Sequence, residues 1–470
     1  MKRGDELTVE IESLTPEGAG IARVEGLVVF VRDGVHGDRL RVQVTRVRKN
    51  LAEASILEVL RPSASRVTPR CRYFGECGGC RLQHVDYAAQ TEFKRRHVVD
   101  ALERIGGFRG IEVRATLAAA SPYLYRNKME FSFGERWLSR EELERADVQA
   151  DRFAVGLHIP VRFDKVLDIE ECWLQSEASA RIVNEVRMFC RERSLPIYST
   201  RTHTGYLRHL VIRQSERTGD LMVNLVTSDE RPAVLQALTE RLRAAVPSIT
   251  TVVNNITTRK AQVAVGEAES VYYGPGYITE VLGTRRYRVS ANSFFQTNTA
   301  QAEGLYDAAR AAADLRREDT VYDLYSGTGT IALHLADAVE RVVGVESVEA
   351  AVADARRNAE FNGVGNCEFV VGDLKERLTR DTGWMKERPL PSAVVLDPPR
   401  AGCHEDVLRV VARLRPERIV YVSCNPATQA RDAQILCSIA PYVPGPAQPV
   451  DMFPQTGHVE NILPLLLLPS

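Results

Sequence analysis

Hydrophobic and polar residues alternate in short runs from Asp5 to about Arg61, and glycine-containing turns separate the runs. The alternating runs are Leu7–Ile11, Leu27–Val31 and Arg39–Val44. A period of two is typical of half-buried β-strands, and short strands joined by glycine turns form small barrels. The pattern therefore predicts a small closed β-barrel over residues 1–61, of the type that binds oligonucleotides.

The middle of the chain mixes strand-like and helix-like patterns. Residues 62–85 are loop-like, and an apolar/polar helix from Asp86 to about Ile105 then ends at two glycines. Residues 116–275 combine both periods and predict an α+β domain, to which we also assign residues 62–85. The expected strands and helices are Lys128–Phe133, Leu207–Arg213, Leu221–Val226, Glu177–Arg191 and Pro232–Ala245.

After Gly276, apolar runs alternate regularly with helical patterns. The expected strands are Val321–Leu324, Arg341–Glu346, Glu368–Val371, Ala393–Asp397 and Arg418–Val422. Strand-helix alternation is typical of a doubly wound parallel α/β sheet. The sequence thus predicts a multidomain protein that ends in such a sheet over residues 276–470.

Composition agrees with this division. The 470 residues are too many for one core, and 44% hydrophobic with 26% charged residues is ordinary for globular domains. The start has no signal-peptide pattern, and the longest apolar run, Ile462–Pro469, is far shorter than the roughly 20 residues that span a bilayer. We expect a cytoplasmic protein. The net charge of -1 gives no global argument for nucleic-acid binding.

Acidic residues and glycines mark the predicted carboxyl edge of the parallel sheet. Gly327 and Gly329 lie between a strand and a helix, where glycine lets the backbone approach a ligand, although a plain strand-to-helix turn would use glycine too. Glu346 ends the next strand and suits the two hydroxyls of a ribose. Asp373 and Asp397 end the following two strands. The chain has no third, phosphate-binding glycine at this loop. This arrangement of glycines and acidic residues at successive strand ends therefore favours S-adenosylmethionine over a dinucleotide.

Cys424 directly follows the last of these strands. A cysteine on a buried strand is commonly a small hydrophobic residue, but Ser423 and Asn425-Pro426 form a polar turn that brings this thiol to the cofactor edge. Free thiols have a pKa near about 8.5, so the thiolate needs local activation. The late segment Asp451–Glu460 adds a carboxylate and a histidine. A nucleophile and a base opposite a methyl donor suit the methylation of an unreactive pyrimidine carbon.

Four further cysteines are candidates for a metal site: Cys71, Cys77, Cys80 and Cys172. Thiolates in a chain without export signals hold zinc or an iron-sulfur cluster. The uneven spacing with one remote cysteine favours the cluster, in a structural or RNA-contacting role.

Local basic runs favour RNA as a partner, although each alone is compatible with a solvated face. The runs are Arg46–Lys49, Lys94–Arg96, Arg201–Arg213 and Arg285–Arg288. Phe294, Phe295 and Tyr325 lie near the predicted site and could stack on a flipped base.

With these motifs, the chain resembles the family of S-adenosylmethionine-dependent RNA uracil-5-methyltransferases. Within this family it is similar to the branch that methylates 23S rRNA and carries a TRAM barrel and an iron-sulfur cluster. Besides the barrel, the cysteines and the glycine loop, the matching motifs are Tyr125–Lys128, Leu207–His209, Ser293–Asn298, Asp397–Arg400, Ser423–Pro426 and Gly457–Glu460. They extend over nearly the whole chain.

The resemblance implies a role for each motif. Cys424 would be the nucleophile and Glu460 the base. The residues implied to line the cofactor and target-base pocket are Gln296, Tyr325, Thr330, Glu346, Asp373 and Asp397. Thr330 stands where some members carry Asn. The four cysteines would bind a 4Fe-4S cluster, and residues 86–115 would pack on the class I methyltransferase domain.

The implied reaction is addition of Cys424 to carbon 6 of a uracil, methyl transfer to carbon 5, and elimination assisted by Glu460. The expected partner is 23S rRNA, with tRNA as the alternative, and the protein is expected to be a monomer. Two other functions remain open from the residues: methylation of a base amino group, and RNA binding without catalysis.

Overall fold

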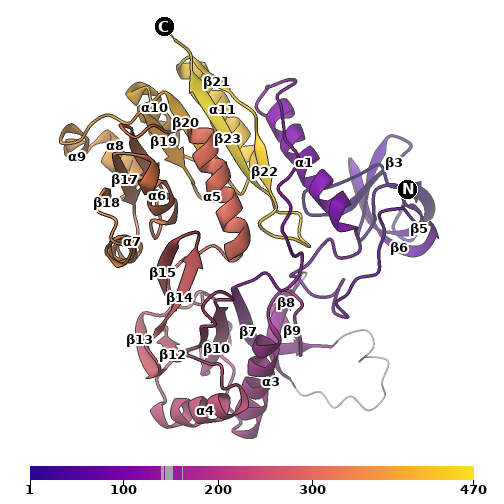
Figure 1. The fold of residues 1–470 in the computed structure, drawn as a ribbon. Helices are drawn as coiled ribbons and strands as arrows, with labels where there is room; N and C mark the ends of the chain where they lie inside the picture. The colour runs from indigo at the N-terminus through magenta and orange to yellow at the C-terminus, as the bar shows by residue number, and fades with distance from the viewer. Residues whose placement is uncertain (139–141, 143–151, 161, 470) are drawn as a thin grey trace.

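The computed structural model describes residues 1–138, 142, 152–160 and 162–469. Figure 1 shows the N-terminal sheet beside the long helix α1 (Tyr87–Arg104), the central sheet with its helices below, and the C-terminal α/β sheet above them. In the part of the chain just given, no helix is long and apolar enough to cross a membrane.

The N-terminal strands form one six-stranded sheet in the order β1-β5-β6-β4-β3-β2. The strands are β1 (Glu6–Glu10), β2 (Ser13–Leu14), β3 (Gly20–Val24), β4 (Leu27–Val31), β5 (Arg39–Arg48) and β6 (Leu51–Arg61). Alternate residues such as Val29, Leu40 and Val42 are fully buried inside it. Only Ile11 and Glu12 separate β1 from β2, and β1 pairs with β5 whereas β2 pairs with β3. The Glu12 N–H also donates to the Ile21 carbonyl oxygen of β3 at 2.8 Å, so this continuous stretch closes the expected barrel. In β6 the buried alternate residues are Ala52 and Ala54, whose small side chains make the hydrophobic alternation hard to see in the sequence.

The central part is a seven-stranded sheet in the order β13-β12-β11-β10-β7-β8-β9. Its elements are β7 (Lys128–Trp137), β8 (Phe153–Ile159), β9 (Arg162–Asp168), α3 (Glu177–Glu192), β10 (Leu207–Gln214), β11 (Leu221–Thr227), α4 (Pro232–Ala245), β12 (Thr251–Ile256) and β13 (Ala268–Tyr273). Ser176 caps α3 by accepting a hydrogen bond from the Ser179 N–H, and Pro232 occupies the first turn of α4, as helix starts favour.

The C-terminal sheet has the order β18-β17-β16-β19-β20-β23-β21, and β22 pairs with β23. Its strands are β16 (Thr320–Leu324), β17 (Arg341–Glu346), β18 (Cys367–Val371), β19 (Ala393–Leu396), β20 (Arg418–Ser423), β21 (Tyr442–Pro444), β22 (Gln448–Val450) and β23 (Glu460–Leu467). The helices are α5 (Thr299–Ala313), α6 (Thr330–Leu335), η1 (Ala336–Ala338), α7 (Glu349–Phe361), α8 (Leu374–Thr379), α9 (Gly383–Lys386), α10 (Glu405–Leu414) and α11 (Pro426–Ile439). A separate hairpin, β14 (Tyr277–Leu282) and β15 (Arg285–Ser290), precedes them.

Strands β16 to β20 pair in parallel, and β23 enters antiparallel between β20 and β21. Successive residues such as Val321 and Tyr322 belong to the cores on opposite faces of the sheet, and both are fully buried. Burial on both faces explains the continuous apolar runs in the sequence. All five parallel strands therefore deliver their carboxyl ends to one edge.

Helix α1 packs on the C-terminal sheet although it lies between the first two sheets in sequence. Asp86 caps it by accepting hydrogen bonds from the Ala88 and Ala89 N–H groups. Its buried residues Val98 and Leu102 join the core that contains β20 and α11, and α1 contacts α11 and β22.

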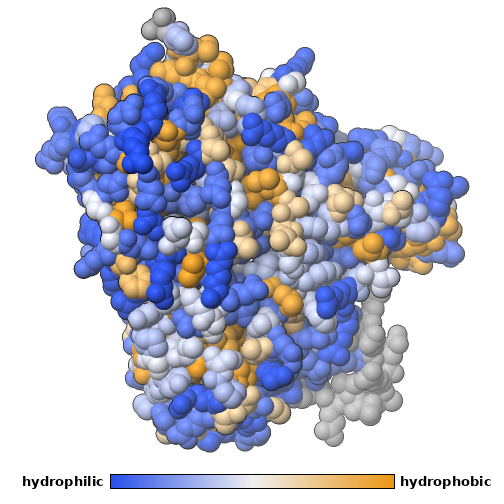
Figure 2. All heavy atoms as spheres, viewed as in Figure 1, coloured by the Kyte–Doolittle hydropathy of each residue, from blue (hydrophilic) through white to orange (hydrophobic). Residues whose placement is uncertain are grey.

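Burial removes individual cations from two of the expected basic runs, whereas Arg96 and Arg201 in the same runs stay exposed. The side chain of Lys94 is fully buried, and Arg208 and Arg213 are 1% and 2% exposed. Arg208 donates to the carbonyl oxygens of Arg259 and Ala261, both at 2.7 Å. These cations hold backbone segments together and are not available to RNA. Figure 2 shows a mostly hydrophilic face, with hydrophobic residues gathered near the C-terminal strands and at the outer edge of the N-terminal sheet.

Candidate active site

A cavity of about 710 Å³ opens at the carboxyl edge of the parallel strands. Among the predicted site residues, seven line it: Gln296, Tyr325, Thr330, Glu346, Asp397, Cys424 and Glu460. They come from five strand ends, the first residue of α6 and one loop, so the fold brings together residues that are far apart in the sequence. The volume is within the range of small-molecule pockets, which is about 300–1,000 Å³.

The loop between β16 and α6 approaches the cavity in a left-handed conformation. Tyr325, Gly327 and Gly329 all have positive φ angles, of 69°, 54° and 77°. A Cβ atom on Gly329 would lie 2.8 Å from the Phe369 ring and 3.0 Å from the Ala355 Cβ atom, so only glycine lets the loop pack this closely.

Glu346 is held in place at the end of β17. The Gly327 N–H donates to its Oε2 atom at 3.1 Å, and the Val348 N–H donates to its Oε1 atom at 2.8 Å. Both carboxylate oxygens are thereby fixed beside the glycine loop. The hydroxyl oxygen of Ser326, which also lines the cavity, is buried and has no hydrogen-bond partner among the described residues.

Two aspartates lie at this edge, of which Asp323 is fully buried and Asp397 is half-buried. Burial raises the pKa of Asp397 to about 7. Burial also raises the pKa of Asp323 to about 7, the charge of Asp397 adds to the rise, and the Ala332 N–H opposes it. Asp323 does not line the cavity. Its Oδ2 atom accepts from the Ala332 N–H at 3.0 Å, which fixes the start of α6.

The antiparallel register of β20 and β23 places Cys424 beside Glu460. Ser423 pairs with Asn461, and each candidate is the next residue at the same end of its strand. Burial raises the pKa of the Cys424 thiol and the charge of Glu460 adds to it, whereas Arg400 lowers it. Burial raises the pKa of Glu460 to about 8, with Asp397 adding to the rise and Arg400 opposing it. The predicted nucleophile and the predicted base therefore line one cavity.

A buried amide pair fixes both strand ends behind this couple. The Gln429 side chain donates to the carbonyl oxygens of Tyr421 and Asn461 at 2.7 and 3.0 Å. The Asn461 side chain donates to the Gln429 Oε1 atom at 2.7 Å. On the outer side, Asn425 caps α11 by accepting from the Ala427 N–H.

Arg400 and Phe453 line the cavity but were not assigned a role from the sequence. An Arg400 guanidinium nitrogen lies 3.3 Å from the His458 Nδ1 atom, and the Asn425 side chain donates to the Arg400 carbonyl oxygen at 3.0 Å. The Phe294 ring lines the same cavity and is 68% exposed, so it can meet a base that enters from solvent. Arg400 ends the motif Asp397–Arg400 and Phe453 lies in the late segment Asp451–Glu460, and these positions were the available signals.

Neighbouring side chains contact the Thr330 hydroxyl and the backbone of Gln296. The Thr330 and Tyr306 hydroxyl oxygens lie 3.0 Å apart. The Asn127 side chain donates to the Gln296 carbonyl oxygen at 2.8 Å, which links the central domain to this loop.

Asp373 differs from the other predicted residues. It is exposed, caps α8 by accepting from the Glu376 N–H at 3.1 Å, and is not among the residues that line the cavity.

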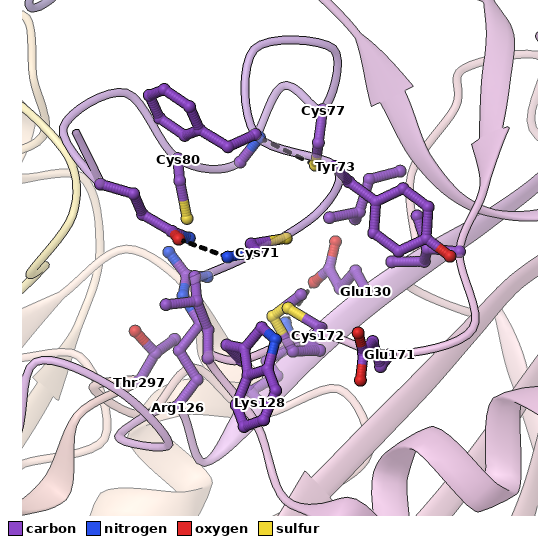
Figure 3. Close-up of a pocket in the computed structure, with 18 residues that line it drawn as sticks. Cys71, Tyr73, Cys77, Cys80, Arg126, Lys128, Glu130, Glu171, Cys172 and Thr297 are labelled. Atoms are coloured by element: carbon purple, nitrogen blue, oxygen red, sulfur yellow. Dashed lines mark hydrogen bonds and ion pairs between the residues drawn. The ribbon is translucent and has the colours of Figure 1, made fainter. Parts of the chain in front are cut away.

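Cys71, Cys77, Cys80 and Cys172 line a second cavity, of about 250 Å³, shown in Figure 3. Burial raises the pKa of both Cys77 and Cys80 to about 12. The Gly79 N–H donates to the Cys77 sulfur at 3.4 Å. Within the described ranges, no three His, Cys, Asp or Glu side chains converge closely enough to hold a metal ion.

Comparison with known proteins adds independent findings. Residues 236–467 match the family described as tRNA (Uracil-5-)-methyltransferase, and residues 1–57 match the TRAM domain. The chain is 48% identical to an uncharacterized RNA methyltransferase of Chlorobaculum tepidum, over 95% of this chain and 92% of the relative. A similar protein of Bacteroides thetaiotaomicron is 42% identical over 97% and 100% of the two chains.

The crystal structure of the Pyrococcus abyssi tRNA (uracil-54, C5)-methyltransferase in complex with S-adenosyl-L-homocysteine has a TM-score of 0.74 with this structure. The two sequences are 30% identical, and the alignment covers 98% of this chain and 99% of that one.

Proposed function

The chain belongs to the RNA uracil-5-methyltransferase family, and we propose that it uses Cys424 and Glu460 to methylate carbon 5 of a specific uridine through a covalent adduct. The observation that carries this proposal is that Cys424, Glu460 and the glycine loop with Glu346 line one cavity. A methyltransferase that acts on an amino group needs a cofactor pocket but no nucleophile in it. A non-catalytic RNA-binding protein needs neither.

The residues around the glycine loop fit S-adenosylmethionine. The fixed Glu346 carboxylate suits ribose hydroxyls, and the unpartnered Ser326 hydroxyl gives a further polar contact. When bound, S-adenosylmethionine supplies an electrophilic methyl group. Carboxyl groups outnumber cationic side chains in the lining, where Glu346, Asp354, Asp397 and Glu460 face the single cation Arg400, and this acidic balance suits a cationic donor.

The first step assigned to the chain is nucleophilic addition. The Cys424 sulfur forms a bond to carbon 6 of the uracil, and the carbon 5–carbon 6 π electrons move toward carbon 5 and oxygen 4, making carbon 5 nucleophilic. Arg400 assists because its charge lowers the pKa of the thiol, against the effects of burial and of Glu460. Phe294 and Phe453 at the cavity give the base apolar surfaces.

The second step is elimination after carbon 5 has taken the methyl group. Glu460 accepts the carbon 5 proton, the electron pair restores the carbon 5–carbon 6 double bond, and the bond from carbon 6 to the Cys424 sulfur breaks. The thiolate is thereby regenerated.

An RNA that carries 5-fluorouridine tests the covalent step, because fluorine replaces the proton that Glu460 must remove. The wild-type protein should form an adduct that survives denaturing electrophoresis, whereas Cys424→Ala should form none. Methylation by Cys424→Ala at the wild-type rate would refute the role of the thiol and favour an amino-group target.

For the RNA itself, we propose 23S rRNA on the strength of the four-cysteine pattern. The similarity to a tRNA methyltransferase supports tRNA as the second candidate. Mapping of 5-methyluridine in both RNAs from a deletion strain decides between them, since only the true substrate loses the modification.

We also propose that Cys71, Cys77, Cys80 and Cys172 bind a 4Fe-4S cluster. A cluster places its four thiolates around a body of several atoms, so its ligands need not converge on one point as those of a single zinc ion do. The N–H group that donates to the Cys77 sulfur is of the kind that stabilises such clusters. Anaerobically purified protein should be brown with about four irons per chain. Colourless protein with one zinc per chain would refute the cluster.

A further inference from the structure

The segment between β22 and β23, residues 451–459, has no helix or strand and leads directly to Glu460. Segments of this kind are commonly mobile and exposed. Here, however, Asp451, Gln455 and Thr456 are 0%, 2% and 4% exposed, and Phe453 lines the active-site cavity. We call residues 451–460, which end with the predicted base Glu460, the base-bearing segment.

One face of α1 contacts this segment through polar side chains. Tyr87, Gln90 and Lys94 are spaced three and four residues apart, so they lie on the same side of the helix. The Lys94 ammonium pairs with the Asp451 carboxylate and donates to the Phe453 carbonyl oxygen at 3.1 Å. The Tyr87 hydroxyl donates to the other Asp451 oxygen at 3.0 Å.

Gln90 makes a reciprocal pair with Gln455. Its amide nitrogen donates to the Gln455 Oε1 atom at 3.0 Å, and its own Oε1 atom accepts from the Gln455 N–H at 3.1 Å. Gln455 has a φ angle of 68°, a left-handed conformation that costs energy in a residue other than glycine. The Gln90 amide, itself 1% exposed, holds the backbone in this conformation.

Stability alone does not explain these contacts. Burying an ion pair requires desolvation of both groups, and apolar side chains of similar volume would stabilise the packing as well or better. The Lys94–Asp451 pair, with both side chains fully buried, and the Lys94 hydrogen bond to the Phe453 carbonyl oxygen instead fix the chain at Asp451 and Phe453.

We propose that Lys94 and Gln90 are positioning residues for the methyl-transfer reaction: they hold the base-bearing segment so that Phe453 and Glu460 keep their places in the cavity. This inference rests on the proposed function, because it assigns the two residues to the elimination step. A displacement of about 1 Å in a reacting group can cost about 100-fold in rate. Cofactor binding should be spared, because Glu346 and Gly327 belong to other elements.

The test uses two independent variants of the full-length protein. Lys94→Met with Asp451→Asn removes both charges together, so that no unpaired buried charge remains. Gln90→Met removes the amide at nearly constant volume. Arg104→Gln is the control, because Arg104 lies on the same helix, is 78% exposed in its side chain and pairs only with Asp100 among the described residues.

We expect both positioning variants to lose about 10- to 100-fold in kcat at saturating RNA, with methylated RNA-protein adduct accumulating. The affinity for S-adenosylmethionine should stay within about twofold of the wild-type value. Adduct accumulation is the diagnostic result, because a general loss of folding would lower attack and elimination alike. The control should turn over like the wild type.

Wild-type turnover in Gln90→Met, or a loss of activity without adduct, would overturn the inference. If the double variant fails to fold, the result with Gln90→Met decides. Failure of the proposed function looks different: the wild-type protein itself would then form no adduct with 5-fluorouridine RNA.

Discussion

Replacing Glu460 with glutamine isolates the last chemical step. The change keeps the size of the side chain and removes its ability to accept a proton. Cys424 can still add to carbon 6 and the methyl group can still be transferred, but the enzyme cannot be released. General-base assistance is typically worth about 100- to 10,000-fold, so the methylated adduct should accumulate within an ordinary assay.

The pKa of Glu460 adds a pH signature. With the pKa raised to about 8, roughly one tenth of the side chain is ionised at pH 7 and roughly nine tenths at pH 9. If elimination limits turnover, the wild-type rate should rise nearly tenfold over this range. In Glu460→Gln, release of the adduct should lose this dependence.

The assay is denaturing electrophoresis of labelled RNA, with and without S-adenosylmethionine. The slow band should carry the methyl group only when the donor is present and should vanish in the Glu460→Gln, Cys424→Ala double variant. Normal turnover of Glu460→Gln, or inactivity without any trapped band, would refute the assignment of the base and point to His458 or a water molecule.

Three other perturbations follow from the contacts. Glu346→Ala should weaken S-adenosylmethionine binding by about 1.5–3 kcal/mol and leave RNA affinity unchanged; calorimetry that gives the wild-type cofactor affinity would disprove the ribose contact. Because the folded-state pKa of Asp323 is raised, its contribution to stability is complete below about pH 4 and is lost as the pH rises through about 7. The Tm of the wild-type protein should therefore fall between these two pH values, and Asp323→Asn should make this fall smaller. In Gly457→Ala the new Cβ atom would lie 1.9 Å from the Pro16 carbonyl oxygen, so the contact between this segment and the N-terminal domain should shift. We expect kcat to fall, and an unchanged kcat would show that the reaction does not need this contact.

Local signals predicted much of the fold. The doubly wound sheet was predictable because the strands β16 to β20 contribute apolar residues to the cores on both faces. The TRAM domain was predictable from the alternation over residues 5–61, and the family from its motifs. Cys424 and Glu460 could be paired only through a quoted motif, since their proximity comes from the β20–β23 register. Asp373 shows the limit of this reasoning. A carboxylate after a strand caps a helix as readily as it faces a ligand, and here it caps α8.

Charged side chains with distant partners could not be placed from the sequence. Lys94 belongs to a run of three basic residues, and such a run predicts a solvated or RNA-facing surface. Its neighbours Arg95 and Arg96 do pair near the surface with Glu92, whereas Lys94 points inward to Asp451. Helical geometry separates successive residues by about 100°, so adjacent cations can have opposite environments, and only tertiary packing shows which one is buried. The residue that the sequence pattern alone assigns to an RNA-facing surface is therefore buried against Asp451, in the segment that leads to Glu460.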